Sequence, residues 1–332
     1  MECFCIALFL FGVVMEILEF FKLNISELLT FVLDGNQRIF WGYIASSIVL
    51  AFIVYRWQLI QSDRNGFVRY LFPKRIYTHS SAVQDYILLI TNKFIKALLF
   101  PIVLFTSVPI AVAISDAFSY LYDLQPIVWS GWAVTLTFTI ILFIFDDFTR
   151  FFLHYILHKV PFLWEFHKVH HSAKVLTPFT IYRSHPVENF LYASRMAIAQ
   201  GGAIGVGFYL FGASEHLNMI AIVEANIFIF LFNVFGSNLR HSHIWLGFGD
   251  KVESVFISPA QHQIHHSLAP EHFDTNFGTA LAIWDKWFGC LVKSSTVPGV
   301  EVGLSESQAD HSSIAKIYLE PFARIFRPSN YK

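Results

Sequence analysis

The sequence has little charge and few cysteines. Charged side chains make up 14% of its 332 residues, whereas a soluble domain usually carries about a quarter. The formal net charge of −1 gives no electrostatic reason to expect nucleic acid as a partner. The three cysteines, Cys3, Cys5 and Cys290, form neither a disulfide framework nor a CxxC metal-binding pair. The chemistry of this chain must therefore come from other residues.

Apolar residues are abundant, at 55% of the chain, and they gather in long runs. A helix that crosses a bilayer needs about 20 mostly apolar residues. The sequence therefore predicts an all-α, polytopic membrane protein in which residues 190–236 form a hairpin that enters the membrane and returns. The predicted transmembrane helices are 3–21, 40–57, 94–115, 127–146, 190–212 and 217–236.

The positions of Lys and Arg orient these segments. Both residue types occur in 56–76 and 150–185 but are absent from 116–126. Because basic loops tend to stay on the cytoplasmic side, we expect both termini and the histidine-rich segments to be cytoplasmic, at a bacterial inner membrane or the endoplasmic reticulum. We expect three regions: an N-terminal membrane region at 1–126, a region at 127–290 that contains the histidine-rich segments, and a tail at 291–332 on the membrane surface or on the preceding region.

Histidine is the unusual component, with 15 residues in the chain. In "DDFTRFFLHYILH", His154 and His158 are four positions apart, which places them about 40° apart on one face of a helix. The segments "HKVHH" at 167–171 and "HQIHH" at 262–266 each set three histidines at i, i+3 and i+4, on one side of a helix. Two shorter patterns, "RSHPVE" and "RHSH", add His185, His241 and His243.

These histidines predict a metal centre. Eight to eleven imidazoles exceed the four ligands of a tetrahedral site and match two metals. Imidazole suits iron, zinc, copper and nickel, so the residue type leaves the metal open. Isolated histidines are expected to be ordinary surface or core residues, and His272 has no pattern that marks it as a ligand. The isolated ones are His79, His216 and His311.

Several carboxylates lie near the histidine segments. A metal-bound histidine usually donates its other N–H to a carboxylate or a carbonyl. We therefore expect these carboxylates to orient the ligands, with salt bridging or helix capping as the alternative. The candidates are Asp146, Asp147, Glu188 and Asp285.

The arrangement HxxxH, HxxHH and a later HxxHH resembles the fatty acid hydroxylase/sterol desaturase superfamily of membrane proteins. The flanking segments "LWEFHKVHHS", "SPAQHQIHHS", "DTNFG" and "WDKWFG" resemble it too, so the similarity runs from Asp146 to Gly289. The resemblance implies a cytosolic helical cap over a transmembrane base, and a centre of two irons that uses O2 to attack a C–H bond of a lipid. It also implies a separate electron donor of the cytochrome b5 or ferredoxin type.

The ligand set predicted from the motifs and the resemblance has ten members, and Asn276 joins Asp147, Glu188 and Asp285 as a supporting residue. His243 stands where such proteins often have Asn, which makes His241 the better candidate of that pair. Zinc remains possible in purified material, because histidine-rich sites accept it. The predicted metal ligands are His154, His158, His167, His170, His171, His185, His241, His262, His265 and His266.

The resemblance favours a sterol or a related lipid as substrate and leaves hydroxylation and desaturation open. Two other functions remain. A zinc-dependent membrane hydrolase needs about three protein ligands and often a glutamate base, but the chain has no HExxH segment. A metal transporter or sensor should carry its histidines inside several spanning segments, whereas here they lie outside them.

Overall fold

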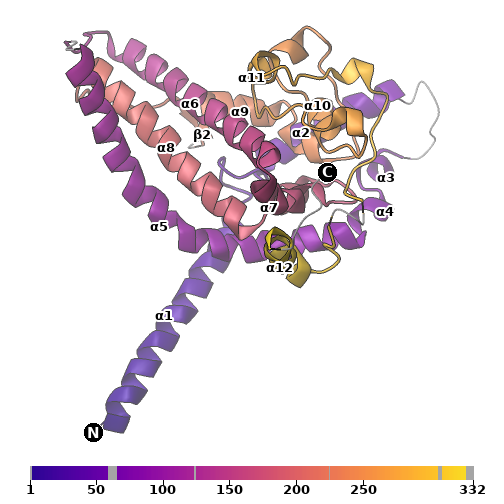
Figure 1. Ribbon diagram of the computed structural model, residues 1–332, viewed down its shortest axis with the longest axis horizontal. Coiled ribbons are helices and arrows are strands. Elements are labelled where there is room, and N and C mark those ends of the chain that lie inside the picture. The colour runs from indigo at the N-terminus through magenta and orange to yellow at the C-terminus, as the bar shows by residue number, and fades with distance from the viewer. Residues whose placement is uncertain (1, 59–65, 123–124, 224, 306–308, 327–332) are drawn as a thin grey trace.

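The structure is a computed structural model that describes residues 2–58, 66–122, 125–223, 225–305 and 309–326. The side chains of 2–14, which include Cys3 and Cys5, and those of 100–105 lie outside the described part. The described chain is mostly helical, as expected from the sequence. Two parts are evident in Figure 1: an arm of long helices and a compact part of short helices and loops.

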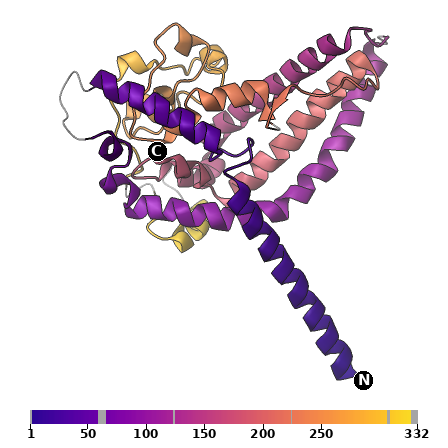
Figure 2. The same ribbon diagram turned by 180° about the vertical axis from the view of Figure 1, so that it is seen from behind.

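The arm contains α5 (Ser80–Tyr122), α6 (Gly131–Lys159) and α8 (Pro186–Phe211), which run side by side in both views (Figures 1 and 2). Two glycines of α8 allow the close approach of α5. A Cβ on Gly201 would lie 2.7 Å from the carbonyl oxygen of Ser107, and one on Gly205 would lie 2.6 Å from that of Ala111. The glycine-rich stretch of α8 therefore serves helix packing.

The N-terminal helices are not part of this arm. Helix α1 (Glu2–Thr30) projects away from the rest of the molecule (Figure 1). Helix α2 (Trp41–Gln58) returns to the compact part, where Ala51 and Val54 pack against Leu239 and Ile244. Two short helices follow, α3 (Phe67–Leu71) and α4 (Lys74–Tyr77).

The compact part is made of α7, η1 and the chain from η2 to α12, and it contains both HxxHH motifs, whereas the HxxxH motif lies on α6. The C-terminal helix α12 docks on α7, where Ile317 is fully buried and the rings of Phe166 and Phe322 are 5.2 Å apart. The elements are α7 (Pro161–His171), η1 (Pro178–Tyr182), η2 (Ser237–His241), η3 (Val252–Ser254), α10 (Pro259–His265), η4 (Pro270–His272), α11 (Ile283–Trp287), η5 (Ser294–Thr296) and α12 (Ile314–Ile325).

The predicted membrane spans are not confirmed. Within the described residues, no helix has both the length and the apolar character that crossing a membrane requires. One predicted helix is also wrong in its secondary structure: 217–236 contains the antiparallel strands β1 (Ala221–Ile222) and β2 (Ala225–Asn226) and only the eight-residue helix α9 (Ile227–Val234). Asn226 sets the start of this shorter helix, because its side chain donates to the carbonyl of the distant Thr139 and accepts from Phe228 N at the start of α9.

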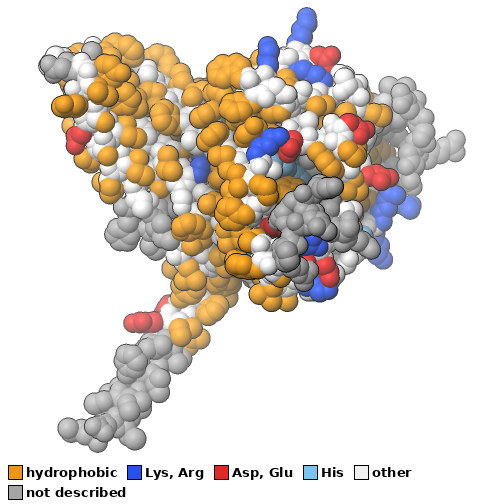
Figure 3. Space-filling model, viewed as in Figure 1, with side chains coloured by type: hydrophobic (Ala, Val, Ile, Leu, Met, Phe, Trp, Pro, Cys, Tyr) orange, Lys and Arg blue, Asp and Glu red, His pale blue; other side chains and the backbone are white. Residues whose placement is uncertain are grey.

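The two parts have different surfaces. In the face seen in Figure 3, hydrophobic side chains gather over the arm, and charged side chains gather over the compact part. Exposed large apolar residues occur on each arm helix, among them Leu98 and Val108 on α5, Trp132 on α6 and Ile198 on α8. The arm therefore presents an extended apolar surface that soluble monomers rarely expose.

Candidate metal centre

Proline and capping side chains fix the helices that carry the histidines. Helix α6 ends at Lys159, and Pro161 starts α7, since proline is well suited to the first turn of a helix. Helix α10 starts with Pro259 after a capping box, in which Ser258 and Gln261 each accept from the other's backbone N–H. His266 is the residue that caps α10 at its C-terminus.

The structure brings nine of the ten predicted ligands into two groups. The first, which we call the five-histidine cluster, joins the end of α6, the face of α7 and the end of α10. In each group the candidate ligand atoms lie within 4.8 Å of one another. The five-histidine cluster consists of His154, His158, His167, His171 and His265.

The second group, the four-histidine cluster, contains His170, His241, His262 and His266. His241 lies at its centre, with its Nε2 3.2 Å from His170 Nε2, 3.2 Å from His266 Nε2 and 3.0 Å from His262 Nε2. Two imidazole nitrogens that each lie about 2.1 Å from one metal would be about 3.0–3.4 Å apart at angles of 90–109°. The spacing in this cluster therefore suits a shared ion.

Backbone carbonyls set the tautomer of several rings. The Nδ1 of His154 donates to Phe277 O at 2.8 Å, that of His265 to Thr275 O at 2.7 Å, and that of His170 to Arg183 O at 3.2 Å. A carbonyl can only accept, so the proton of each neutral ring is on Nδ1. The Nε2 of each ring is then a bare lone pair directed into its cluster.

Glu188 is the predicted carboxylate that contacts a cluster histidine, since its Oε1 lies 3.1 Å from His167 Nδ1. The other predicted supporting residues act on the loop that carries Thr275 and Phe277. Asp285 accepts from Phe277 N at 2.6 Å and from Gly278 N at 2.9 Å. Asn276 bonds the backbone on both sides of this loop, donating to Gln261 O and accepting from Val292 N.

Asp147 holds the next part of the same loop. It accepts from Ala280 N at 2.8 Å, from Leu281 N at 3.1 Å and from Trp284 Nε1 at 2.8 Å. Because α6 also carries His154, this carboxylate ties the helix to the loop whose carbonyl orients that histidine. Asp147 therefore supports the centre through the backbone and not by direct contact with a ligand.

His262 differs from the other oriented histidines. The Nη2 of Arg240 donates to His262 Nδ1 at 2.7 Å, and it also donates to Gly278 O. A guanidinium can only donate, so the neutral His262 ring carries its proton on Nε2, and it would have to give up that proton to bind an ion through Nε2. This places a fixed positive charge directly beside the four-histidine cluster.

Burial keeps the imidazoles neutral. It lowers the pKa of His167 to about 3 and that of His170 to about 4. The other seven rings of the clusters also have a pKa well below the usual range, because of burial first and neighbouring imidazoles and arginines second. Burial raises the pKa of Glu188 to about 8. The neutral imidazole is the form that binds a metal.

The unpaired nitrogen atoms show that the five-histidine cluster fits a metal ion. The Nε2 atoms of all five rings are buried and have no hydrogen-bond partner. Buried polar atoms are almost always paired, because an unpaired one costs about 1–3 kcal/mol. Five such atoms that converge on one point match the donor set of a metal that prefers imidazole.

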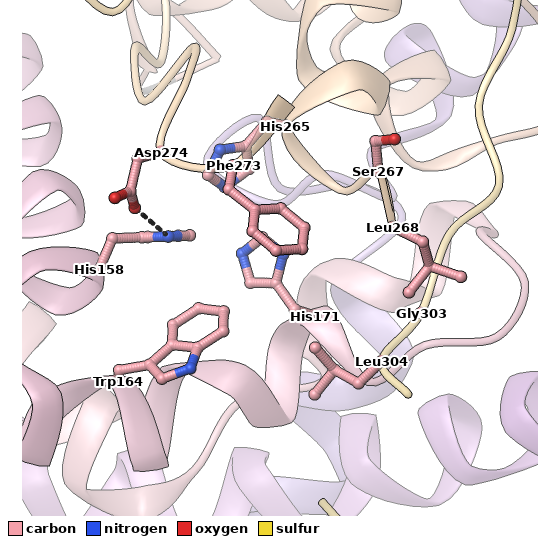
Figure 4. A pocket seen from close by; sticks show the side chains of 10 residues that line it. All are labelled: His158, Trp164, His171, His265, Ser267, Leu268, Phe273, Asp274, Gly303 and Leu304. Atoms are coloured by element: carbon pink, nitrogen blue, oxygen red, sulfur yellow. Dashed lines mark ion pairs between the residues drawn. The ribbon is translucent and has the colours of Figure 1, made fainter. Parts of the chain in front are cut away.

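Two cavities reach the clusters. A small cavity of about 200 Å³ is shown in Figure 4, where His158, His171 and His265 point into it and Asp274 pairs with His158 at 3.6 Å. A larger cavity of about 550 Å³ is lined by residues of both clusters, including His154 and His241. Small and large molecules can therefore approach the histidines through different cavities.

His185 is the predicted ligand that the structure does not bring to either cluster. Its Nδ1 accepts from Val187 N at 3.1 Å at the start of α8, and its Nε2 donates to Tyr318 O at 3.0 Å. The two other doubtful histidines are also engaged elsewhere, since His243 Nε2 bonds Tyr70 O and His272 Nδ1 bonds Ser267 Oγ.

Sequence reasoning missed three basic residues of the larger cavity, Arg38, Lys96 and Arg240. Lys96 has a recognisable pattern, because it lies inside the apolar run 94–115, where a charge is costly and often functional. Arg240 directly precedes His241, but the sequence does not reveal its contact with His262. Arg38 lies in a region without a motif.

The chain is similar in sequence to several known proteins. It is 25% identical over 224 residues to ornithine lipid hydroxylase OlsE of Rhizobium tropici, a match that covers 67% of this chain and 59% of that protein. It is 27% identical over 174 residues to alkylglycerol monooxygenase of Caenorhabditis elegans, covering 50% of this chain and 30% of the relative. It is also 27% identical over 159 residues to Delta(7)-sterol 5(6)-desaturase ERG3B of Gibberella zeae, covering 48% and 43%.

The chain thus spans 59% or less of the length of these curated relatives. No solved structure matches it. The profile of the fatty acid hydroxylase family matches residues 139–290, a range that contains both histidine clusters and encloses the similarity expected from Asp146 to Gly289. Residues 139–290 are thus similar to the fatty acid hydroxylase family.

Proposed function

We propose that this protein is an oxidoreductase that uses O2 to oxidise a C–H bond of a lipid, by hydroxylation or desaturation, at two irons held by the two histidine clusters. The observation that carries the proposal is the convergence of nine buried, neutral imidazoles in two adjacent groups. The family match and the printed activities of the relatives, which include lipid hydroxylases and sterol desaturases, support the same reaction class.

The five-histidine cluster and the four-histidine cluster would each hold one ion. Bound iron would supply the redox chemistry that no side chain can supply. The electrons would come from a separate donor protein, as the sequence analysis expected. The lipid substrate could be a sterol, as favoured from the sequence, or another amphiphile.

The residues of this chain position the reaction and protect it. The carbonyls of Thr275 and Phe277 and the carboxylate of Glu188 hold three rings of the five-histidine cluster. Asp147 and Asp285 keep that loop in place through five hydrogen bonds. Fixed ligands need little reorganisation during the reaction. The burial of the rings excludes bulk water from the centre.

We propose that lipid reaches the histidine clusters by way of the apolar surface of the arm. Exposed apolar side chains on α5, α6 and α8 form an extended surface, and we propose that this surface contacts the bilayer that supplies the substrate. The location of the site on the cytoplasmic side, and the number of membrane crossings, stay predictions from the sequence.

The test is metal content together with O2-dependent turnover. Protein purified in a neutral detergent should hold about two irons per chain and oxidise a lipid extract only when O2 and a reductant are both present. The variant His265→Ala with His266→Ala removes one ligand from each cluster and should lose both the iron and the oxidation. His216→Ala, a half-exposed histidine outside the clusters, should keep them.

Two outcomes contradict the proposal. Turnover of an ester or amide without O2, after reconstitution with zinc, would instead show a zinc hydrolase. Metal that exchanges across a vesicle membrane, with no oxidation by the iron-loaded protein, would show a transporter. If the zinc form is isolated first, iron reconstitution precedes the turnover assay.

A further inference from the structure

The larger cavity is strongly basic. Of the residues that line it, five are cationic and Glu188 is the acidic one. Asp146, which is not in the wall, pairs with two of the cations, Arg150 at 2.7 Å and Arg195 at 2.8 Å. Five cations against two carboxylates leave an excess of three positive charges before any metal is bound. The cationic residues are Arg38, Lys96, Arg150, Arg195 and Arg240.

Several donors of these cations are available to a ligand. Lys96 is exposed in the wall and forms no hydrogen bond or ion pair with a residue in the described part of the chain. The Nε atoms of Arg195 and Arg240 are buried without a partner, and both side chains are more than nine-tenths buried. Buried donors without acceptors are costly, so these groups fit a ligand that brings acceptor oxygens.

The remaining wall combines apolar side chains with the histidines. Leu99 of α5 and Met196 of α8 line the cavity, as do five histidines from the two clusters. Arg240 is the link between the two regions, because its guanidinium contacts His262 at 2.7 Å. A molecule in this cavity therefore meets positive charge, apolar surface and the candidate metal centre together.

An uncharged lipid does not match this lining. A sterol has few polar atoms and would cover the cations without giving them acceptors, at the cost of removing them from water. An anionic group would accept charge-assisted hydrogen bonds, which are roughly twice as strong as neutral ones. The excess of positive charge also favours the approach of an anion.

We propose that the substrate of this enzyme is an amphiphile with an anionic headgroup, a phosphate or a carboxylate, which binds beside Lys96, Arg38 and Arg240 while its carbon chain lies against the histidine clusters. The proposal rests on the oxygenase function for the ligand to be a substrate. The binding of the headgroup is independent of that function, because it needs neither O2 nor an electron donor.

The test is direct binding by calorimetry in a neutral detergent, with dodecyl phosphate, dodecanoate, dodecan-1-ol and inorganic phosphate as probes. We expect dodecyl phosphate and dodecanoate to bind at least tenfold more tightly than dodecan-1-ol. Lys96→Gln should reduce this preference to threefold or less, and Lys96→Arg should keep it. Lys251→Gln, which removes an exposed lysine that is not among the lining residues of the cavity, is the matched control and should bind like the wild type.

Four results would overturn the proposal. Dodecan-1-ol could bind as tightly as the two anions. The preference could survive Lys96→Gln and Arg38→Gln combined. Inorganic phosphate could bind as tightly as dodecyl phosphate, which would show a simple anion site. The preference could also occur only in iron-loaded protein and be insensitive to the lysine, which would place the headgroup on the metal. Metal content and O2 consumption, measured on the same samples, report separately on the oxygenase function.

Discussion

The two histidine clusters use the same residue type but are held in different electrostatic surroundings. In the five-histidine cluster, the Nδ1 partners of His154, His265 and His167 are oxygen atoms, two from backbone carbonyls and one from the carboxyl group of Glu188. In the four-histidine cluster, one ring, His262, faces the guanidinium of Arg240. The comparison teaches that ligand count alone does not set the affinity of a site. Acceptor atoms that orient an imidazole ring favour the binding of a cation by that ring. The positive charge of an adjacent arginine disfavours it.

Removal of ligands should have the largest effect. His158→Ala with His265→Ala takes two of five ligands from one cluster, whereas His241→Ala takes the central ring of the other. Each variant should lose about one metal per chain and all measurable oxidation. The measurement is metal per chain by mass spectrometry, with His216→Ala as control. If either variant lost both metals, the two clusters would not be independent sites.

The next largest effect is expected in the order in which the two clusters lose their metal ions. A graded chelator should remove the ion of the four-histidine cluster first, at least tenfold more easily than that of the five-histidine cluster. The physical reasons are one fewer ligand and the charge of Arg240 against His262. Metal content and spectrum, followed during the titration in wild type and His241→Ala, check the order. A single transition in the wild type, with both ions lost together, would contradict the comparison.

The carboxylate of Glu188 can be tested on its own. Glu188→Gln keeps the shape of the side chain but replaces the titratable carboxyl group near His167 with an amide. Mutation of a group that orients a metal ligand typically costs about 10–100-fold in metal affinity, so we expect about tenfold at the five-histidine cluster. Glu215→Gln, on an exposed glutamate, should leave the affinity unchanged. An equal loss at both clusters would argue for a general structural effect instead.

Acid should destabilise the metal-free protein. The folded-state pKa of each cluster histidine lies below its ordinary value of about 6.5, with His170 at about 4 and His167 at about 3. The unfolded chain therefore binds more protons below pH 6.5, and the free energy of unfolding falls as the pH falls. The pKa values of Glu188 and Asp285 are raised to about 8 and about 7, so these two groups increase the free energy of unfolding as the pH falls. They are outnumbered by the cluster histidines.

Denaturant titrations of chelator-treated protein at pH 7.5, 6.5 and 5.5 measure this effect. We expect the free energy of unfolding to fall between pH 6.5 and 5.5 by more than about 1.4 kcal/mol, the value for one proton per pH unit. A free energy of unfolding that stays constant or increases as the pH falls from 6.5 to 5.5 would show that the histidines are not buried in the folded state.

His185→Ala should have the smallest effect. It removes the acceptor for Val187 N and the bond to Tyr318 O, which cap α8 and dock α12. We expect a loss of about 1–2 kcal/mol in the free energy of unfolding and no change in metal per chain. Loss of a metal in this variant would return His185 to the ligand set.

The sequence contained most of the centre. The two HxxHH segments and the HxxxH segment lie on helices, and their spacing placed eight rings on inward faces because helical geometry is local. His185, also predicted as a ligand, lies in neither cluster and caps α8 at a helix start that includes Pro186 and Glu188. The division into five and four ligands, and the partner of His262, depend on tertiary contacts that no local spacing encodes.

The arm shows a similar limit. The apolar run 94–115 lies inside the longer helix α5, and the run 127–146 is helical only from Gly131, where the longer helix α6 begins. The run 217–236 does not form the single helix that hydropathy predicts. Asn226 and Thr139 form a polar contact, and a new helix starts at Ile227. Hydropathy could not reveal Lys96 and Arg38 as neighbours in one cavity, because they come from separate segments.

The contact between His154 and His265 has a consequence for how the protein is assembled. Their rings are 4.5 Å apart, yet they come from α6 and from α10, towards opposite ends of residues 139–290. Contacts between distant segments carry a loop-closure cost and slow the folding of a chain. A metal ion that bridges them can bind only after most of the domain has formed. Its binding energy then stabilises the whole domain against global unfolding and not merely one local segment.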